Sequence, residues 1–552
     1  MPPTSRSTYE PLHRTSSDFD YELQDNNSEE FKDKPLPLRR RRGIVFALLR
    51  LTRRFISRAC RPLYIALFLV VFLIWQVTFN APYIDSLAPS FEIDKRETVF
   101  IAANIIDAEL ISGAWGDTLA QLVQSIGVER VFVSIYGGPE KALKELDGRL
   151  EKLGLGVGGK GGRRVVSEDE EPLEIGGLPR TRLPTGEERV KRIAFLAEVR
   201  NKALEPLDEG IGRWDKVLFV NDVFFDVQGA LRLLWGSKGD GNGETKAVCA
   251  ADFVTSWKYY DTFATRDAEG YSIGIPIFPW FGNVGSQVSR RDVMAGKDRV
   301  RVKSCWGGMV AFQGRFFQQP ASSSLSRRET TNGAGLGKPE LPLRFRSEPE
   351  PFWDSSECCL IHADIIASSA TSSSKKKDDS FHTGIYMNPF VRVSYDGSTQ
   401  KHIWLAKRFE ALFTIPQGII NRLAHMPRFN YRRAEVEGQI VRDRLWISLN
   451  SNKTADEQFM QGVEEFGGVV GRGVHVGLGE RDRVGMEKRA TIGGVKGKEY
   501  WANEGYYVEF NRTARRGGYC GVRQLLVMKE GKLEEGEGNW DNLLDEVPPW
   551  EM

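Results

Sequence analysis

The sequence predicts an α/β fold in which a mostly parallel central sheet is flanked by helices and preceded by one N-terminal transmembrane helix. Two observations predict it. Apolar, strand-like runs alternate with helical patterns from about residue 97 onward, and one continuous apolar segment follows a cluster of arginines near residue 60. Strands that alternate with helices at this spacing form parallel sheets covered by helices. The chain has 552 residues, 41% of them hydrophobic, which suffices for one large core with insertions.

The first 61 residues are predicted to be a basic, disordered tail on the cytosolic side. Residues 1–38 are polar, rich in Ser, Asp and Glu, and poor in large apolar residues, a composition typical of disordered chain. Nine arginines and no acidic residue lie between Arg39 and Arg61. Positive charge of this density is retained in the cytosol when an apolar segment follows it.

Residues 62–80 are predicted to be the transmembrane helix. The run from Leu63 to Phe79 is almost wholly apolar, and its length is near the short end of what spans a bilayer. A buried core helix is the alternative, which the flanking arginines disfavour. The run lies too far from Met1 for a cleaved signal peptide. Residues 81–96 are then a short stem, and everything after about residue 80 is expected in the lumen.

The globular part is predicted to extend over residues 97–430, with residues 431–552 as a C-terminal extension of the same domain. Its elements alternate along the chain: VFIAANI, a helix near Asp117–Ile126, VFVSIYGGP, the helical KALKELDGRLEKLG, the helical RVKRIAFLAEVRNKALEPL, the strand KVLFVND, a helix near Gly229–Trp235 and the strand AVCAADFV. Ligands of such sheets bind outside the carboxyl ends of the strands, which is where the chemistry is expected.

Three low-complexity stretches interrupt this pattern and are interpreted as surface loops: about 156–172, 321–336 and about 368–379. The extension after about residue 431 is Gly-rich and charged, with one apolar patch, YCGVRQLLVM. It either completes the core or forms a small appendage.

Charge and cysteine usage exclude some functions and constrain others. A net charge of +2 gives no indication of nucleic-acid binding. Five cysteines follow the apolar run, an odd number, so at least one is predicted to lack a disulfide partner within the chain: Cys249, Cys305, Cys358, Cys359 and Cys520. No CxxC pair occurs, which disfavours a zinc ribbon. Asn452 and Asn511 begin sequons for N-glycosylation.

The segment Lys216–Asp226, KVLFVNDVFFD, carries the strongest chemical signal. An apolar strand runs directly into Asn221 and Asp222, and Asp226 follows. A carboxylate at the carboxyl end of a central strand is well placed to hold Mg²⁺ or Mn²⁺ against a diphosphate. The alternative is a strand-to-helix junction in which Asp222 or Asp226 caps the helix.

A second signal lies about twenty residues upstream, where the predicted helix carries Arg200 and Asn201. Arg200 is suited to bidentate bonds with a diphosphate, and Asn201 to a nucleoside or a carboxylate. A solvated helix face is the alternative. The combination of an Arg-Asn helix with the strand ending in Asn221-Asp222 favours a nucleotide-sugar donor site.

The chain resembles the fungal capsule-associated α-1,3-mannosyltransferase family over about residues 97–430. The resemblance is carried by an ordered set of motifs: FIAANIIDAE, VFVSIYGGP, RIAFLAEVRNKALEPL, VLFVNDVFF, CAADFV, YYDTFATRD, SCWGGMVAF, SECCLIHADI and NPFVRVSYD. It implies a GT-A fold, GDP-mannose as donor, a divalent cation (Mn²⁺ or Mg²⁺), and retention of anomeric configuration. It also implies a single-pass type II protein of the Golgi membrane that works in a glycosyltransferase complex. Val220-Asn221-Asp222 stands where GT-A enzymes typically have Asp-x-Asp.

Four further residues complete the predicted site. Asp252 ends the strand AVCAADFV, and we expect it either to contact donor-sugar hydroxyls or to be a buried structural carboxylate. Trp306 precedes two glycines and is expected to stack on the acceptor sugar, with a packed turn as the alternative. SSECCLIHADI is read as a short apolar strand that places Glu357 near the reacting centre and His362 as an additional metal ligand, although a lone histidine is as often structural.

The sequence therefore predicts a metal-dependent glycosyltransferase that moves mannose from GDP-mannose to a glycan hydroxyl. In this hypothesis Asp222 and His362 hold the cation, Arg200 and Asn201 hold the nucleotide, and Glu357 with Trp306 shape the acceptor side. Two alternatives stay open: the same fold with another donor such as UDP-xylose or UDP-galactose, and a catalytically silent scaffold of glycan synthesis.

Overall fold

The computed structural model describes these residues: 50–54, 62–79, 91–183, 187–236, 244–277, 280–320, 339–369, 381–407, 410–428, 430–448, 454–465, 505–529 and 538–543. The chain divides into two compact units, Met1–Ala81 and Pro82–Met552. Several predictions concern segments outside the described residues: the disordered tail, most of the arginine cluster, the first part of the stem, two of the three insertions (321–336 and nearly all of 368–379) and the sequon at Asn452.

The described part of the first unit contains helix α2, Pro62–Phe79, which coincides with the predicted transmembrane segment. Its large apolar side chains, among them Leu63 and Phe68, are exposed. Among the helices that the structure describes, none is both long and apolar enough to cross a membrane.

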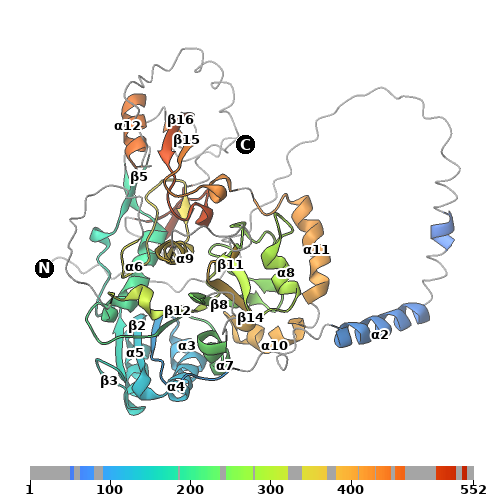
Figure 1. Cartoon of the computed structure of the whole chain (residues 1–552), viewed down its shortest axis with the longest axis horizontal. Helices are drawn as coiled ribbons and strands as arrows, with labels where there is room; N and C mark the ends of the chain where they lie inside the picture. Colours follow the sequence, from blue (N-terminus) through green and yellow to red (C-terminus); the bar gives the residue numbers. More distant parts are fainter. Residues whose placement is uncertain are drawn as a thin grey trace. The chain divides into compact units, whose positions relative to one another are not determined.

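The second unit is built around a sheet of eleven strands, in the order β10-β11-β14-β8-β12-β7-β1-β2-β4-β3, with β9 paired to β8. Figure 1 labels β2, β3, β8, β11, β12 and β14 of this sheet. The strands are β1 Val99–Ile105, β2 Val131–Gly137, β3 Gly156–Val157, β4 Gly162–Ser167, β7 Lys216–Val220, β8 Ala247–Thr255, β9 Lys258–Tyr259, β10 Arg266–Asp267, β11 Val300–Ser304, β12 Met309–Gln313 and β14 Ile385–Ser394. Strands β7, β1, β2, β4 and β3 are parallel, β14 is parallel to β8, and β12 is antiparallel to both of its neighbours. A mixed α/β fold with a large, mostly parallel central sheet is confirmed.

Helices cover both faces of this sheet, because side chains along each buried strand alternate between two apolar cores. In β1, Phe100 and Ala102 belong to one core, and Val99 and Ile101 belong to the other. The described helices of this unit are α3 Ala108–Ser112, α4 Ala114–Ile126, α5 Glu140–Lys152, α6 Arg192–Leu204, α7 Val227–Leu231, α8 Val288–Met294, α9 Glu357–Ser368, α10 Gly397–Lys407, α11 Glu410–Leu423 and α12 Ala455–Glu465. Buried residues of α6 and α9 line the first core, and those of α4, α5 and α7 line the second.

Two predicted elements are wrong. The stretch 156–172 was expected to be a surface loop, but β4 lies within it and pairs in parallel with β2. Arg163 on β4 is buried and donates a hydrogen bond to Asp147 at 2.7 Å. The glycines around Arg163 are the reason that the sequence pattern did not indicate a strand here. SSECCLIHADI was expected to be a strand, but it forms helix α9. Nine consecutive residues of α9 are buried, Glu357 to Ile365, and a helix buried on all sides has no 3.6-residue period to detect.

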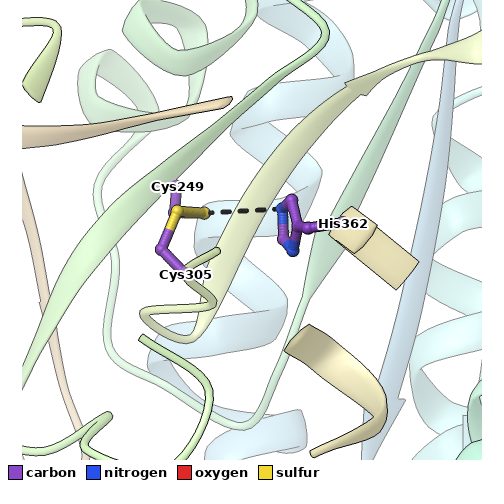
Figure 2. A group of neighbouring side chains, drawn as sticks. All are labelled: Cys249, Cys305 and His362. Atoms are coloured by element: carbon purple, nitrogen blue, oxygen red, sulfur yellow. Dashed lines mark hydrogen bonds between the residues drawn. A yellow bond between two sulfur atoms is a disulfide. The ribbon is translucent and has the colours of Figure 1, made fainter. Parts of the chain in front are cut away.

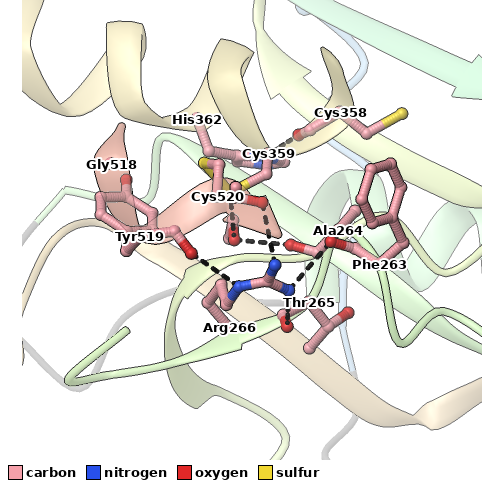
Figure 3. Close-up of a disulfide and its surroundings, with 12 residues drawn as sticks. Phe263, Ala264, Thr265, Arg266, Cys358, Cys359, His362, Gly518, Tyr519 and Cys520 are labelled. Carbon is pink, nitrogen blue, oxygen red and sulfur yellow. Dashed lines mark hydrogen bonds between the residues drawn. A yellow bond between two sulfur atoms is a disulfide. The ribbon is translucent and has the colours of Figure 1, made fainter. Parts of the chain in front are cut away.

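In the described part of the C-terminal extension, the segment around Cys520 completes the core, whereas a pair of strands and helix α12 pack around a separate apolar cluster. Strand β17, Gly521–Val522, pairs with β13, Asp354–Ser355. A disulfide joins Cys520 to Cys359 of α9, and the buried Arg266 donates hydrogen bonds to the carbonyl oxygens of Tyr519 and Cys520 at 2.7 and 2.9 Å (Figure 3). The remaining two-stranded pairs are β5 Arg180–Arg182 with β6 Glu188–Val190, β15 Ile440–Ser448 with β16 Gly505–Thr513, and β18 Leu526–Met528 with β19 Trp540–Asn542.

The predicted unpaired cysteine is confirmed. Cys249 bonds to Cys305, Cys359 bonds to Cys520, and Cys358 is a free, buried thiol.

Candidate active site

The carboxyl end of β7 places Asn221 and Asp222 at an edge of the sheet, as predicted, with both residues half-buried. Three hydrogen bonds hold this turn in place. The Asn221 amide donates to the Gly308 carbonyl at 2.9 Å, and the Trp115 indole donates to the Asn221 carbonyl at 2.9 Å. The Phe224 amide donates to the carbonyl of Ser394, at the end of β14, at 2.7 Å. Asp222 is therefore presented by a fixed backbone.

Arg200 of α6 joins three other predicted residues at this edge. Its Nε donates to Oε1 of Glu357 at 2.9 Å, and its Nη1 donates to Oδ1 of Asn221 at 3.2 Å. The guanidinium carbon lies 4.4 Å from the ring centre of Trp306, a cation–π distance. Side chains from α6, β7, α9 and the turn before β12 thus converge, as the topology of the sheet requires.

The charge of Arg200 is held in a largely buried environment, since its side chain is 12% exposed. Burial lowers the pKa of Arg200, but the neighbouring Cys358 and Glu357 side chains raise that pKa by more than burial lowers it. Arg200 is therefore a permanent cation. The Cys358 thiol donates to Oε1 of Glu357 at 3.3 Å, and burial raises the pKa of this thiol well above its usual range.

The carboxyl groups of Asp252 and Asp261 form a pair close to this edge of the sheet. Asp252 was expected to end its strand but lies within β8, which continues to Thr255. Its Oδ1 accepts a hydrogen bond from the backbone amide of Asp261 at 3.1 Å, and its Oδ2 accepts one from the Tyr395 hydroxyl at 2.9 Å. Burial, followed by the charge of Asp261, raises the pKa of Asp252 to about 8. Burial also raises the pKa of Asp261. The structural alternative for Asp252 is the one the structure shows, because its side chain is buried and both of its oxygens have partners.

Asp261 also fixes the glycine turn. Its Oδ2 accepts a hydrogen bond from the Trp306 amide at 2.9 Å. Gly307 has a φ of 59°, and a Cβ there would lie 2.0 Å from the Ala250 carbonyl oxygen, so only glycine fits this approach. The turn predicted from Cys305-Trp306-Gly307-Gly308 is therefore present, and the disulfide from Cys305 to Cys249 ties it to β8.

Trp306 does not have the role predicted for it. Its side chain is 4% exposed and is packed between Arg200 and the rings of Phe219 and Phe345. A ring with so little exposed surface cannot also stack on an acceptor sugar. The structure shows the packed-turn alternative, in which the Trp306 ring packs against the Arg200 guanidinium.

Asn201 likewise faces away from the edge. Its Oδ1 accepts a hydrogen bond from the Phe345 amide at 2.9 Å, and its Nδ2 donates to the Phe345 carbonyl at 3.0 Å. Both ends of the amide are thus used to fasten residue 345 to α6, and the structure does not support a nucleotide contact by Asn201.

The structure does not support His362 as a metal ligand. Its side chain is 0% exposed, in the core between Phe312 and the Cys249–Cys305 disulfide (Figure 2). Nδ1 lies 2.8 Å from the Cys358 carbonyl and therefore donates to it, while Nε2 faces the sulfur of Cys249 at 4.0 Å. Burial lowers the pKa of His362 to about 4, so the ring is neutral. Although these three side chains are close together, sulfurs joined in a disulfide do not ligate a metal as thiolates.

Of the two predicted metal ligands, only Asp222 is placed where it could bind the expected cation. Magnesium-type ions in phosphate-transfer sites take one or two protein carboxylates and complete their shell with water and substrate phosphates. A half-buried carboxylate at the sheet edge beside a buried arginine matches that requirement. Among the residues that the structure describes, the only close set of three His, Cys, Asp or Glu ligand atoms is the one around His362, so no cage of protein ligands surrounds Asp222.

Sequence reasoning missed the roles of Asp261 and Tyr395. Asp261 stood in the motif YYDTFATRD, but its hydrogen bond with the Trp306 amide joins positions that are 45 residues apart. Tyr395 follows β14 as an isolated residue, and no local pattern relates it to Asp252, which precedes it by 143 positions.

Comparison with known proteins finds one family model that the chain matches. Residues 98–364 match the family model described as cryptococcal mannosyltransferase 1. No curated protein matches the chain. Solved structures with some similarity include a mycobacterial protein, at 13% identity over 67% of this chain and 82% of the other, with a TM-score of 0.24. Glucosyl-3-phosphoglycerate synthase from Mycobacterium tuberculosis, crystallised with Mn²⁺, UDP and phosphoglyceric acid, shows 12% identity over 65% and 88%, with a TM-score of 0.25. These TM-scores are too low to carry an argument.

The family match covers the residues that converge at the sheet edge, including Arg200, Asn221, Asp222, Trp306 and Glu357. The family match and the site therefore coincide in one segment. Over this segment the chain is similar to the cryptococcal mannosyltransferase family, and it is a glycosyltransferase.

Proposed function

We propose that this glycosyltransferase moves mannose from GDP-mannose to a hydroxyl group of a glycan, forming an α-1,3 linkage with retention of configuration and depending on Mn²⁺ or Mg²⁺. One observation carries the proposal: Arg200, Asn221 and Glu357 meet beside Asp222 at the carboxyl edge of the sheet, inside the segment that matches a mannosyltransferase family.

In this proposal Asp222 holds the cation and Arg200 attracts the diphosphate of the donor. A bound cation would neutralise the charge that develops on the leaving nucleotide. Arg200 contributes a fixed positive charge to the same oxygens, because its ion pair with Glu357 and its contact with Trp306 hold it in one position. Electrostatic stabilisation by preorganised groups is the largest part of most transfer catalysis.

Glu357 is assigned a positioning role rather than that of a base. Its side chain is buried and accepts hydrogen bonds from both Arg200 and Cys358. In a retaining transfer the leaving phosphate can itself accept the proton of the acceptor hydroxyl, so no side-chain base is required. Arg200 and Glu357 therefore act as one unit that orients the donor.

The first test is a donor panel with the full-length chain. Purified protein is supplied with GDP-mannose, UDP-xylose or UDP-galactose, with Mn²⁺ or with EDTA, and release of nucleotide and transfer to mannoside acceptors are measured. We expect transfer from GDP-mannose only, abolished by EDTA. Transfer from a UDP-sugar instead would replace the proposed donor and keep the fold.

A catalytically silent scaffold is the second candidate, favoured by one observation: β7 ends in Asn221-Asp222, with a single carboxylate where two are typical of the GT-A fold. GDP and Mn²⁺ binding without turnover of any donor would support this candidate over the first.

The cellular placement is proposed from the sequence. We propose that the segment around α2 anchors the protein in the Golgi membrane as a single-pass type II protein, with the catalytic unit in the lumen and other glycosyltransferases of the Golgi as partners. The almost wholly apolar sequence of α2 and the arginines before it support this topology.

A further inference from the structure

The hairpin formed by β8 and β9 carries two exposed aromatic rings. Trp257 is 48% exposed and Tyr260 is 45% exposed. Among the Phe, Tyr and Trp side chains whose burial the structure describes after residue 82, no other is exposed to a comparable degree. Tyr and Trp are enriched at binding interfaces, which makes this hairpin a candidate binding surface.

Tyr260 is held at the edge that contains the candidate active site. Its amide donates to the Asp252 carbonyl oxygen at 3.0 Å. Its ring centre lies 4.5 Å from that of Tyr395, and the Tyr395 hydroxyl is bonded to the Asp252 carboxyl group. The following residue, Asp261, bonds the amide of Trp306. Tyr260 therefore packs against the site, and 45% of its surface is exposed.

Asp222 and the segment that follows it lie near Tyr395, the residue against which Tyr260 packs. The charge of Asp222 is one of the influences that raise the pKa of Tyr395, after burial, Asp252 and Tyr260. The loop that follows Asp222 is bonded to the end of β14 through Phe224 and Ser394, immediately before Tyr395. A molecule lying on Tyr260 is thus adjacent to the point where the donor's cation would be held.

We propose that Tyr260 is the stacking platform of an acceptor-sugar subsite, on which the apolar face of a pyranose ring lies while one of its hydroxyl groups points toward the donor at Asp222. This inference rests on the proposed function and names the substrate class of the same site. Trp257, three residues earlier, extends the platform for a second sugar unit. The platform takes the place that Trp306 cannot fill, because Trp306 is covered.

The surroundings favour a sugar over a lipid surface. An aromatic ring covers the C–H face of a sugar, and neighbouring carboxyl groups accept bonds from its hydroxyls. Asp222 is half-buried at the same edge, and its negative charge disfavours an anionic headgroup.

The test measures acceptor binding separately from transfer. Binding of methyl α-mannoside and α-mannobiose to the full-length chain is followed by saturation-transfer NMR in the presence of GDP and Mn²⁺. We expect Tyr260→Ala to weaken binding of both probes about tenfold. Tyr260→Phe, which keeps the ring, should stay within about twofold of the wild type. Trp257→Ala should weaken α-mannobiose binding and leave methyl α-mannoside unchanged.

The affinity for GDP, measured by calorimetry, and the melting temperature serve as controls, and both should be unaltered in all three variants. Unchanged mannoside binding by a folded Tyr260→Ala protein would overturn the subsite. If the wild-type chain binds mannosides through Tyr260 but transfers no mannose, the proposed function fails and the subsite stands. If the wild type transfers mannose and Tyr260→Ala transfers it with an unchanged KM for acceptor, the subsite fails and the function stands.

Discussion

Asp222 and Asp226 lie four residues apart in one loop but have different tasks. Asp226 caps helix α7, since its side chain accepts a hydrogen bond from the Gly229 amide at 2.7 Å, and it is exposed. Asp222 is half-buried at the end of β7 beside the convergence of Arg200, Asn221 and Glu357. The two carboxylates therefore form a natural pair of test and control.

Asp222→Ala and Asp222→Asn should each abolish mannose transfer while leaving the protein folded, because an amide preserves the shape but removes the charge that holds a cation. Asp226→Ala should keep transfer and lower stability by about 1 kcal/mol, the usual cost of losing a helix cap. Mn²⁺-dependent turnover of GDP-mannose gives the activity, and circular dichroism verifies folding. A folded Asp222→Ala protein with wild-type turnover would show that the metal site lies elsewhere.

Asp252 makes a pH-dependent contribution to stability. Its pKa is raised to about 8 in the folded chain, from 3.8 in the unfolded one, so the folded state binds an extra proton between those values. Stability should therefore fall as pH rises through this window. Asp252→Asn keeps a partner for both the Asp261 amide and the Tyr395 hydroxyl but cannot ionise. The difference between the melting temperature of this variant and that of the wild type should therefore shift in favour of the variant as the pH rises from 5 to 8. A difference that does not change with pH would contradict this assignment.

At the scale of single elements, helix α9 links the site to the C-terminal extension. Its first residue, Glu357, bonds Arg200, and Cys359 is joined to Cys520 across 161 positions. Arg266 reinforces the same junction, and burial lowers its pKa to about 10, so it stays charged at neutral pH (Figure 3). The extension therefore holds α9, and through it Arg200, in place.

Removing this disulfide should be costly. The double variant Cys359→Ala/Cys520→Ala should lose about 4–5 kcal/mol of unfolding free energy, because the disulfide closes a very long loop of the unfolded chain. Cys358→Ala is the matched control: it removes a buried thiol next to the disulfide and should cost far less. Urea unfolding of the three proteins measures both quantities. Equal losses in the two variants would mean that packing, not the crosslink, holds the extension.

At the scale of the whole molecule, the proposed topology places the two ends of the chain on opposite sides of a membrane. Arg39–Arg61 should be cytosolic and Asn511, which is exposed on β16, should be luminal. Protease added to sealed vesicles should then shorten the full-length chain only by its N-terminal tail. Digestion of the catalytic unit with protection of the tail would reverse the topology, and complete digestion would indicate that the catalytic unit lies outside the vesicles.

The sequence by itself determined the elements whose signals are local. Strand and helix periods differ, so β1, β2, α5, α6, β7 and β8 follow from the spacing of apolar residues. The position of Asp222 at the edge of the sheet follows from the strand that precedes it. The odd number of cysteines after the apolar run was enough to predict an unpaired thiol.

Only the tertiary structure decided which polar groups meet. Arg200 and Glu357 are 157 positions apart, and nothing local to either predicts their ion pair. The burial of Trp306, the inward turn of Asn201 and the sealed environment of His362 likewise depend on neighbours from distant segments. Helix α9 shows the general reason: a segment buried on every side loses the contrast between apolar and polar faces, and that contrast is the only information about packing that a local pattern contains.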